Sequence, residues 1–366
     1  MSVEFKCPSC AGDLSVKSDE KTTTCPYCGS SVLVPDELRE STQIGPTVVI
    51  ETARTARSAA SCVIVAVALG MLLISGLTVF LLTNAGSKDG ESLLQGDADA
   101  VLTFGAEGTG HGYFSDPRHI AVDGDGHIYV ADYTTGRIQV FDGSGSFIRQ
   151  WNVEGVNDEA YISSMDASQG GTVYVTETGR ILAYDGATGD PLGMLTDIDG
   201  FSDLFVTEDG DVLATMWSCG DRLCRLAPDG TAELDITGAV DEAAGSSELS
   251  PLVAADGTGD IFVLGTFNGR VFRFDEDGAF RDMFGSSGTE PGQFGFPSDI
   301  SVDGRGYVYV PDSGGFISVF DTSGRFLDRI DLPFYDYVYG MDVGPDGNLY
   351  LVTGGFEVVV IPPYGG

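Results

Sequence analysis

Residues 116–148, DPRHIAVDGDGHIYVADYTTGRIQVFDGSGSFI, carry the pattern that decides the fold of most of this chain. An apolar quartet is followed by an Asp-Gly turn, an apolar strand, a second turn and a further strand. Residues 296–327, FPSDISVDGRGYVYVPDSGGFISVFDTSGRFL, repeat this pattern closely. Because Asp-Gly and Gly-Gly pairs adopt the positive φ angles that tight hairpin turns need, both stretches predict antiparallel β-hairpins.

Four looser copies of the pattern begin at Met165, Asp203, Leu252 and Met341. The residues that close the first strand of the six copies lie 39–49 residues apart and are Asp123, Ser168, Thr207, Asp256, Asp303 and Gly344. A repeat of this length with four short strands predicts a β-propeller. The last copy has no outer strand after EVVVI, whereas residues 100–105, AVLTFG, match the outer-strand pattern. We therefore expect this early segment to complete the last blade and close the ring.

A known family resembles these repeats. The elements FGAEGTGHGYFSDPRHIAVDGDGHIYVAD, GRIQVFD, FGSSGTEPGQFGFPSDISVD and YVYVPD are similar to NHL repeats. The resemblance covers residues 100–362 and implies an all-β, six-bladed propeller, in agreement with six copies. It also implies a recognition platform, and membrane-tethered NHL propellers resemble the sensor portions of bacterial receptor kinases. This chain has no kinase signature, so signalling would require a partner.

A membrane segment is predicted between two soluble parts. Residues 62–82, CVIVAVALGMLLISGLTVFLL, contain no charged side chain and would span about 31 Å as a helix, close to the hydrocarbon thickness of a bilayer. Arg54 and Arg57 precede this segment and only Lys88 follows it closely, which favours a cytoplasmic N-terminus and an extracellular propeller. The expected order is a linker at 35–61, one transmembrane helix, a tether at 83–99 and the propeller at 100–366.

The N-terminal residues 1–34 contain a cysteine cluster with the spacing C-x2-C-x14-C-x2-C, formed by Cys7, Cys10, Cys25 and Cys28. Four thiolates on two such pairs can close a tetrahedron around Zn²⁺. Residues 3–34 resemble a zinc ribbon, in which LSVK and TTT would form a short hairpin. So small a domain buries little core, and structural zinc would supply its folding free energy. A rubredoxin-type iron site and a thiol switch are the alternatives.

The charge of the chain excludes nucleic acid as a partner. The formal net charge is −36, and after residue 82 there are 13 Lys and Arg against 47 Asp and Glu, a charge of −34. Such a field repels nucleic acid and anionic lipid surfaces. The ribbon also lacks clustered positive charge, so a cytoplasmic protein partner is expected there. An alternative reading is that many of these Asp residues were chosen for turn geometry.

A ligand site is predicted at the mouth of the central channel. The residue before each inner quartet should face this mouth, and across the copies these residues are His119, Ser164, Asp203, Pro251, Asp299 and Gly340. His119, Asp203 and Asp299 could together hold a second divalent metal. Arg118 beside them could hold an anionic substrate. The alternative is that an Asp before a strand accepts backbone N–H bonds.

Several observations weigh against an enzyme. The chain has no P-loop, no Gly-x-Ser-x-Gly and no His-Glu-x-x-His, so no catalytic residue is assigned. Its three histidines all lie in the first repeat, a poor match to the NHL-like amidating lyases with their central metal-binding histidines. We therefore expect a membrane-anchored protein that recognises an extracellular protein, peptide or glycan. A metal-dependent hydrolase or lyase at the channel mouth is the alternative.

Two further groups have structural interpretations. Cys219 and Cys224 lie across a turn and are predicted to form a disulfide on the outer side of the membrane, with two free thiols as the alternative. Asp132, Glu177 and Asp312 occupy the same place in the YVAD-like element and are predicted to cap neighbouring backbone groups.

Overall fold

The computed structural model of the chain describes residues 99–155, 160–216, 221–248, 250–334 and 336–365, together with four short strands near the N-terminus. The chain divides into two compact units, residues 1–57 and residues 58–366.

The first unit contains two antiparallel hairpins. β1 (Ser2–Lys6) pairs with β2 (Asp13–Lys17), and β3 (Thr22–Thr24) pairs with β4 (Ser31–Leu33). The expected pairing of LSVK with TTT is therefore wrong, because each segment pairs instead with the strand across its neighbouring cysteine pair. Cys7, Cys10, Cys25 and Cys28 lie outside the described residues, and the zinc ribbon stays a prediction.

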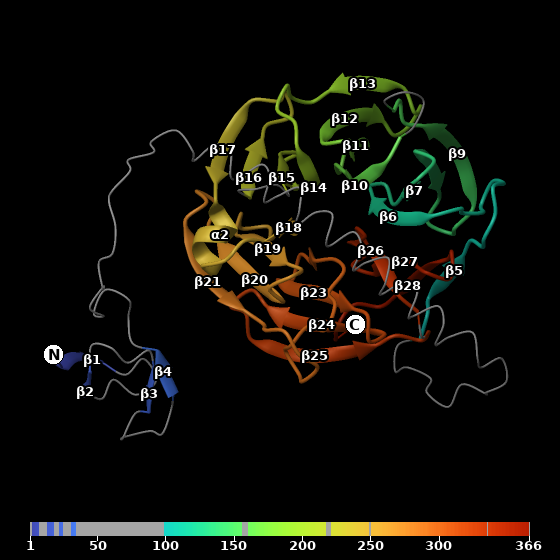
Figure 1. Cartoon of the computed structure of the whole chain (residues 1–366). Coiled ribbons are helices and arrows are strands. Elements are labelled where there is room, and N and C mark those ends of the chain that lie inside the picture. The colour runs from blue at the N-terminus through green and yellow to red at the C-terminus, as the bar shows by residue number, and fades with distance from the viewer. Residues whose placement is uncertain are drawn as a thin grey trace. The chain divides into compact units, whose positions relative to one another are not determined.

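The second unit contains six four-stranded antiparallel sheets, arranged as blades around a central axis (Figure 1). The inner strands are β6 (Pro117–Val122), β10 (Ile162–Ala167), β14 (Phe201–Val206), β18 (Pro251–Ala255), β22 (Ser301–Val302) and β26 (Val338–Val343). The second strands are β7 (Ile128–Asp132), β11 (Thr172–Glu177), β15 (Val212–Met216), β19 (Ile261–Gly265), β23 (Tyr307–Asp312) and β27 (Leu349–Thr353). The all-β, six-bladed fold is confirmed.

Two further strands complete each blade. The third strands are β8 (Arg137–Phe141), β12 (Arg180–Asp185), β16 (Arg222–Leu226), β20 (Arg270–Phe274), β24 (Phe316–Asp321) and β28 (Val358–Ile361). The outer strands are β9 (Phe147–Asn152), β13 (Pro191–Met194), β17 (Ala232–Thr237), β21 (Phe280–Phe284), β25 (Phe326–Asp331) and β5 (Leu102–Phe104). The second strands are almost wholly buried, whereas β9 alternates between half-buried and exposed residues, as expected for a strand with one solvated face.

The same turn follows the inner strand in all six blades. Its first residue donates its backbone N–H to the carbonyl four residues later, in the pairs Asp123–His127, Ser168–Thr172, Thr207–Asp211, Asp256–Asp260, Asp303–Tyr307 and Gly344–Asn348. Gly126 in the first of these turns has a φ of +80°, which an L side chain rarely adopts. The alignment of the six copies is therefore confirmed at the level of hydrogen bonds.

The ring closes through the earliest strand of the unit. β5 pairs antiparallel with β28, with Thr103 opposite Val359, and so becomes the outer strand of the sixth blade. The inner strand β26 of that blade also contacts β6 of the first blade. The predicted closure is confirmed, and it gives β28 a partner strand on both of its edges.

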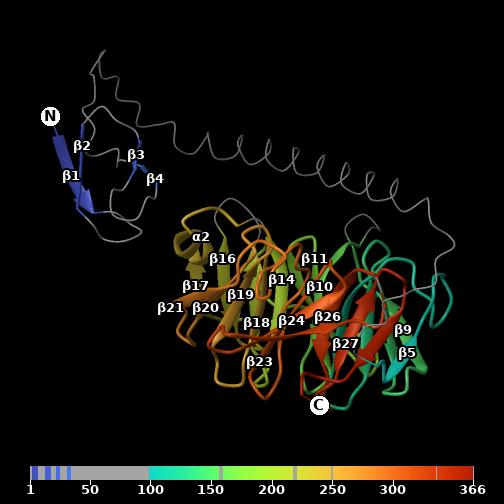
Figure 2. The ribbon, with the colours of Figure 1, turned by 90° about the horizontal axis from the view of Figure 1, so that it is seen from below.

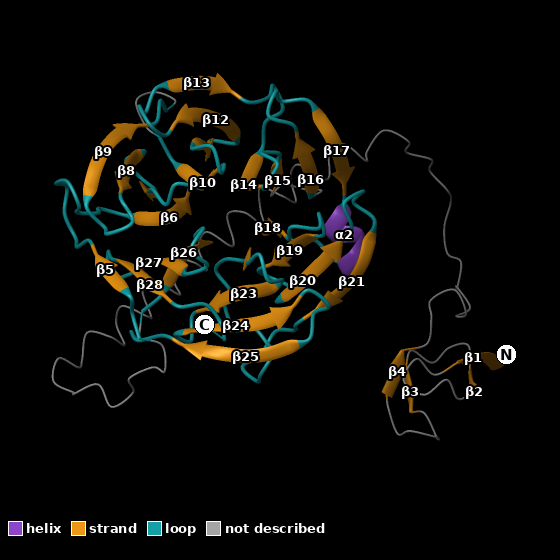
Figure 3. Cartoon of the chain, turned by 180° about the vertical axis from the view of Figure 1, so that it is seen from behind, coloured by secondary structure: helices purple, strands orange, loops and turns teal. Residues whose placement is uncertain are grey.

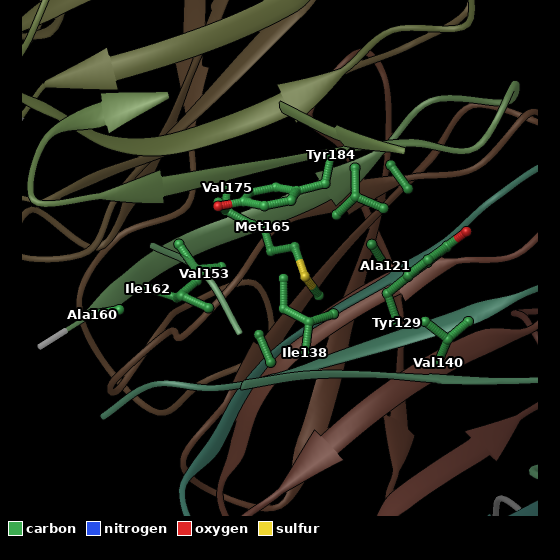
Figure 4. Close-up of a cluster of buried hydrophobic side chains, with 13 residues drawn as sticks. Ala121, Tyr129, Ile138, Val140, Val153, Ala160, Ile162, Met165, Val175 and Tyr184 are labelled. Atoms are coloured by element: carbon green, nitrogen blue, oxygen red, sulfur yellow. The ribbon is translucent and has the colours of Figure 1, made fainter. Parts of the chain in front are cut away.

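Hydrophobic side chains fill the spaces between neighbouring blades. Figure 4 shows one such cluster, in which Ile138 and Val140 of the first blade meet Met165 and Val175 of the second. Because each blade has a buried face on both sides, its stability depends on having two neighbours. This is the general reason why repeats of this kind close or stack.

The unit has two faces, seen from the side in Figure 2. Loops that lead from an outer strand to the next inner strand open on the same face as the turns between second and third strands. We call this the mouth face, and the opposite one the turn face. The short helix α2 (Ala239–Ala244) belongs to the loop before the fourth blade (Figure 3).

Within the described part of the chain, no helix is both long enough and apolar enough to cross a bilayer. The predicted transmembrane segment at 62–82 lies outside that part.

The pairing of β5 with β28 predicts that side chains of β5 stabilise the propeller. Phe104 of β5 packs against Phe141 with ring centroids 4.8 Å apart. Phe104→Ala should lower the free energy of unfolding of the propeller by about 2 kcal/mol, less than for a fully buried Phe because Phe104 is half-buried. Both tryptophans of the chain, Trp151 and Trp217, fall within residues 100–366, so urea unfolding followed by fluorescence reports on this part of the chain.

The matched control for Phe104→Ala is Leu192→Ala. Leu192 lies on the outer strand β13 and is 60% exposed, so its removal should change stability by less than about 0.5 kcal/mol. Equal effects of the two substitutions would show that β5 does not hold the ring closed.

Candidate functional site

The inner strands surround a narrow channel with polar side chains. A cavity of about 70 Å³ is lined by His119, Ser164, Asp203, Asp299 and Gly340, which are five of the six residues predicted at the mouth. Pro251, the sixth, is buried at the start of β18, and its carbonyl oxygen accepts a hydrogen bond from Thr215 Oγ1 at 2.7 Å. The structure therefore brings the three candidate metal ligands to one cavity.

Two carboxylates of the channel were not predicted from the sequence. Asp166 and Asp342 line the same cavity from the second and sixth blades, where Ser164 and Gly340 hold the predicted mouth position. Each Asp lies two residues after that position on the same strand. Because strand side chains alternate with period two, the pair belongs to the same face, and this alternation was the signal that could have found them.

Each of the four channel carboxylates joins its blade to the next one. In every case a backbone N–H of the next blade donates to Oδ2 of the Asp. The N···O distance is 2.6 Å for Val206–Asp166 and 2.7 Å for Val253–Asp203, Met341–Asp299 and Val122–Asp342. Ser164 Oγ also donates to Asp203 Oδ1 at 2.8 Å. The alternative reading, that these Asp residues accept backbone bonds, describes their structural role.

Burial raises the pKa of these carboxyl groups. Loss of water disfavours the charged form and brings the pKa of Asp203 to about 6 and that of Asp166 to about 7. The pKa of Asp299 rises to about 8, with the charge of Asp203 adding to the effect of burial. The pKa of Asp342 is raised well above its usual range by burial and by Asp166. The channel therefore carries protons near neutral pH.

His119 shows the opposite shift for the same reason. Burial, together with the positive charge of Arg118, lowers its pKa to about 4. The imidazole is therefore neutral at pH 7, which is the form that a metal ion requires. However, among the described residues no three His, Cys, Asp or Glu side chains are grouped so that they could hold a metal ion.

Arg118 lies on the mouth face between aromatic rings. Its guanidinium carbon is 4.2 Å from the centroid of Tyr133 and 5.6 Å from that of Tyr339. Asp116 accepts its Nε–H at 2.9 Å, so the charge of Arg118 is already paired. Arg118 is not among the residues that line the channel cavity, and its role in holding an anionic substrate stays a prediction.

The turn face carries a much larger hollow. A cavity of about 1000 Å³ is lined by the turns after the inner strands and reaches Asp166 and Asp342 at its base. Most of its charged side chains are acidic, although Arg305 pairs with Asp303 and Arg225 also lines the wall. Asp303 itself accepts Tyr309 Oη at 2.9 Å and holds its own turn, so part of this acidity is structural.

Comparison with known families agrees with this geometry. Residues 114–141 match the NHL repeat, and residues 248–357 match a family described as a 6-bladed beta-propeller. The second unit therefore contains a six-bladed β-propeller, and its first blade matches the NHL repeat.

Two kinds of relatives share sequence with this propeller. NHL repeat-containing protein 3 from Homo sapiens is 27% identical over 259 residues, which cover 67% of this chain and 65% of the relative. This chain thus spans just under two thirds of the length of that relative. The E3 ubiquitin-protein ligase TRIM71 from Rattus norvegicus is 51% identical over only 47 residues, which cover 13% of this chain and 6% of the ligase.

Solved structures share the fold at lower identity. A luciferin-regenerating enzyme superposes with a TM-score of 0.53 at 14% identity, over 69% of this chain and 92% of the enzyme. A gluconolactonase from Xanthomonas campestris has the same TM-score at 16% identity, over 75% of this chain and 99% of the enzyme. At this identity the likeness concerns the fold alone.

Other predicted groups of the propeller have structural roles. Asp132 Oδ1 accepts the backbone N–H groups of Ser115 and Asp116, both at 2.9 Å. Asp312 accepts the N–H of Gly295 at Oδ2 (2.6 Å) and that of Phe296 at Oδ1 (3.3 Å). Cys224 is a buried free thiol whose Sγ lies 3.8 Å from Asp235 Oδ1. Because the thiol of Cys224 is free, the predicted disulfide with Cys219 is wrong, and Cys219 itself lies outside the described residues.

The channel carboxyls predict how stability depends on pH. Their folded pKa values lie above the usual 3.8, so the stability they contribute is present at low pH and is lost as pH rises through about 6 to 8. His119, with its lowered pKa, costs stability only below about 6.5. Urea unfolding should therefore show a propeller that becomes less stable between pH 6.5 and 8.5.

The variant Asp299→Asn distinguishes the pH dependence caused by the channel carboxyl groups from that caused by the other charged groups of the propeller. Each titrating group contributes a slope of at most about 1.4 kcal/mol per pH unit, and the variant should have a shallower slope than the native chain over this interval. The control is Asp277→Asn, on an exposed turn far from the channel. A native profile that is flat from pH 6.5 to 8.5 would contradict the prediction.

Proposed function

We propose that this chain is a membrane-anchored recognition protein whose propeller binds an extracellular protein, peptide or glycan. A cytoplasmic zinc ribbon, held by Cys7, Cys10, Cys25 and Cys28, would contact a protein partner. The observation that carries the proposal is the distribution of exposed aromatic side chains in the propeller. It is independent of the resemblance to NHL repeats.

Among the described residues of the propeller, six large aromatic side chains are clearly exposed, and five of them belong to loops or strand starts on the mouth face. They are Tyr113 (50% exposed), Tyr161 (41%), Phe267 (51%), Phe296 (75%) and Tyr339 (38%). The sixth, Phe280, is at the start of an outer strand. Exposed aromatic residues gathered on one face are typical of binding surfaces, because they bury large areas at little cost in side-chain entropy.

The second candidate function is a metal-dependent hydrolase or lyase at the channel mouth. Its support is that a luciferin-regenerating enzyme and a gluconolactonase share the fold, and that His119, Asp203 and Asp299 line one cavity. Against it, the carboxylates already accept backbone N–H groups from neighbouring blades. A metal would have to compete with those bonds, and the described part of the chain offers no preformed group of ligands.

Elemental analysis of the full chain, purified and dialysed without chelator, separates the two functions. We expect about one zinc per chain, held by the ribbon, and no second metal. Cys7→Ser should lower the zinc content, whereas His119→Ala should leave the metal content unchanged. A second metal that is lost on His119→Ala would favour the enzyme and overturn the recognition proposal.

The membrane orientation has its own test. The proposal places Cys7 and Cys10 in the cytoplasm and the exposed turn residue Ser144 outside the cell. On intact cells, an impermeant thiol reagent should therefore label Ser144→Cys and leave the N-terminal cysteines unlabelled. Labelling of Cys7 and Cys10 before the membrane is permeabilised would contradict this orientation.

A further inference from the structure

We infer that the mouth face binds a cationic peptide segment, with Arg or Lys side chains placed against a row of tyrosine rings. This inference rests on the proposed recognition function and names its ligand class. The row consists of Tyr161, Tyr133, Tyr339 and Tyr337, with Arg118 between the second and third rings. We call these five residues the tyrosine row.

The tyrosine row is continuous across three blades. The ring centroids of Tyr161 and Tyr133 are 5.8 Å apart, and those of Tyr339 and Tyr337 are 5.1 Å apart. Arg118 links the two pairs, since its guanidinium lies 4.2 Å from the Tyr133 centroid and 5.6 Å from that of Tyr339. The row thus runs from the second blade over the first to the sixth, beside the mouth of the channel.

The backbone holds this row in place before any ligand arrives. Tyr133 donates its N–H to the Asp116 carbonyl at 2.8 Å, and its own carbonyl accepts the N–H of Ile162 at 3.2 Å. Gly340 allows the close approach of the sixth blade, because a Cβ there would lie 2.5 Å from the carbonyl oxygen of Arg118. A preordered surface loses less entropy on binding than a mobile one.

The contacts of Arg118 show that rings of this row can pack against a cation. The face of a tyrosine ring attracts a cation through its quadrupole, and Arg118 makes this contact with two rings. Its charge is paired with Asp116, so it does not repel a second cation strongly. The outer rings, Tyr161 and Tyr337, have no cation against them among the described residues.

The charges around the row favour a basic partner. In the first, second and sixth blades, the arginines of the mouth face are Arg118, Arg137 and Arg180, and each is ion-paired. Asp336, beside Tyr337, and Glu154, in the loop that leads to Tyr161, are exposed and form no ion pair within the described residues. The uncompensated charge at both ends of the row is therefore negative, as is the propeller as a whole.

Calorimetric titration of the full chain tests the inference with synthetic probes. The probes are a twelve-residue peptide of alternating Arg and Gly, a matched peptide of alternating Glu and Gly, and cellohexaose as a neutral glycan. We expect only the Arg peptide to bind, with an affinity that falls as salt is raised from about 50 to 300 mM. Tyr161→Ala and Tyr339→Ala should each weaken it about two- to fivefold.

Three control variants distinguish the tyrosine row from the general acidity of the propeller. Tyr339→Phe keeps the ring and should keep the affinity, and Phe280→Ala removes an exposed ring from an outer strand and should have no effect. Glu208→Gln with Asp209→Asn removes charge from the turn-face cavity and should also have little effect. Unchanged unfolding curves would show that the alanine variants are folded.

The possible outcomes separate this inference from the proposed function. Equal affinity of the alanine variants for the Arg peptide, or loss of binding only in the Glu208 and Asp209 variant, would overturn the tyrosine row as the site. Ring-dependent binding of cellohexaose alone would overturn the cationic ligand but leave the recognition function standing. No binding of any probe would overturn the inference, and a propeller metal lost on His119→Ala would overturn the recognition function as well.

Discussion

A hydrogen bond from one blade to the carboxylate of another is the interaction on which the rest of the propeller depends. An inner strand pairs with only one strand of its own sheet, so its other edge presents unpaired backbone N–H groups. At four of the six junctions an Asp of the preceding blade accepts one of them, as Asp342 does for Val122 and Asp203 for Val253. These bonds link four blades to the next one, and they bring four buried carboxyl groups to the channel.

The structural role of the channel carboxylates limits the chemistry that the channel can perform. Carboxylates that already accept backbone bonds are poor candidates for a metal, and their raised pKa values leave them partly protonated at neutral pH. His119 is neutral there, which keeps net charge in the channel low. Other polar and aromatic groups lie outside the channel, and on the mouth face several rings and carboxylates are exposed.

The strongly acidic composition has two origins in this fold. Asp123 accepts the N–H groups of Asp125 and His127 and the hydroxyl of Tyr129, so its charge is used within its own turn. Asp303 does the same in the fifth blade. Carboxylates such as Asp336 and Glu154 have no such internal ion-pair partner among the described residues. The carboxylates that hold turns explain why Asp recurs in the repeats, and the exposed carboxylates give the mouth face its negative charge.

The sequence by itself determined the number of blades, their strand order and the closing role of residues 100–105, because these depend on local turn chemistry and on hydrophobic alternation. It also identified His119, Asp203 and Asp299 as channel residues. It did not determine that LSVK and TTT pair with other strands, nor that Asp166 and Asp342 join the ring. Only the tertiary structure decided which N–H each carboxylate accepts and which tyrosines meet around Arg118. Both depend on residues from different blades, whose distance is fixed by the packing between sheets rather than by any local pattern.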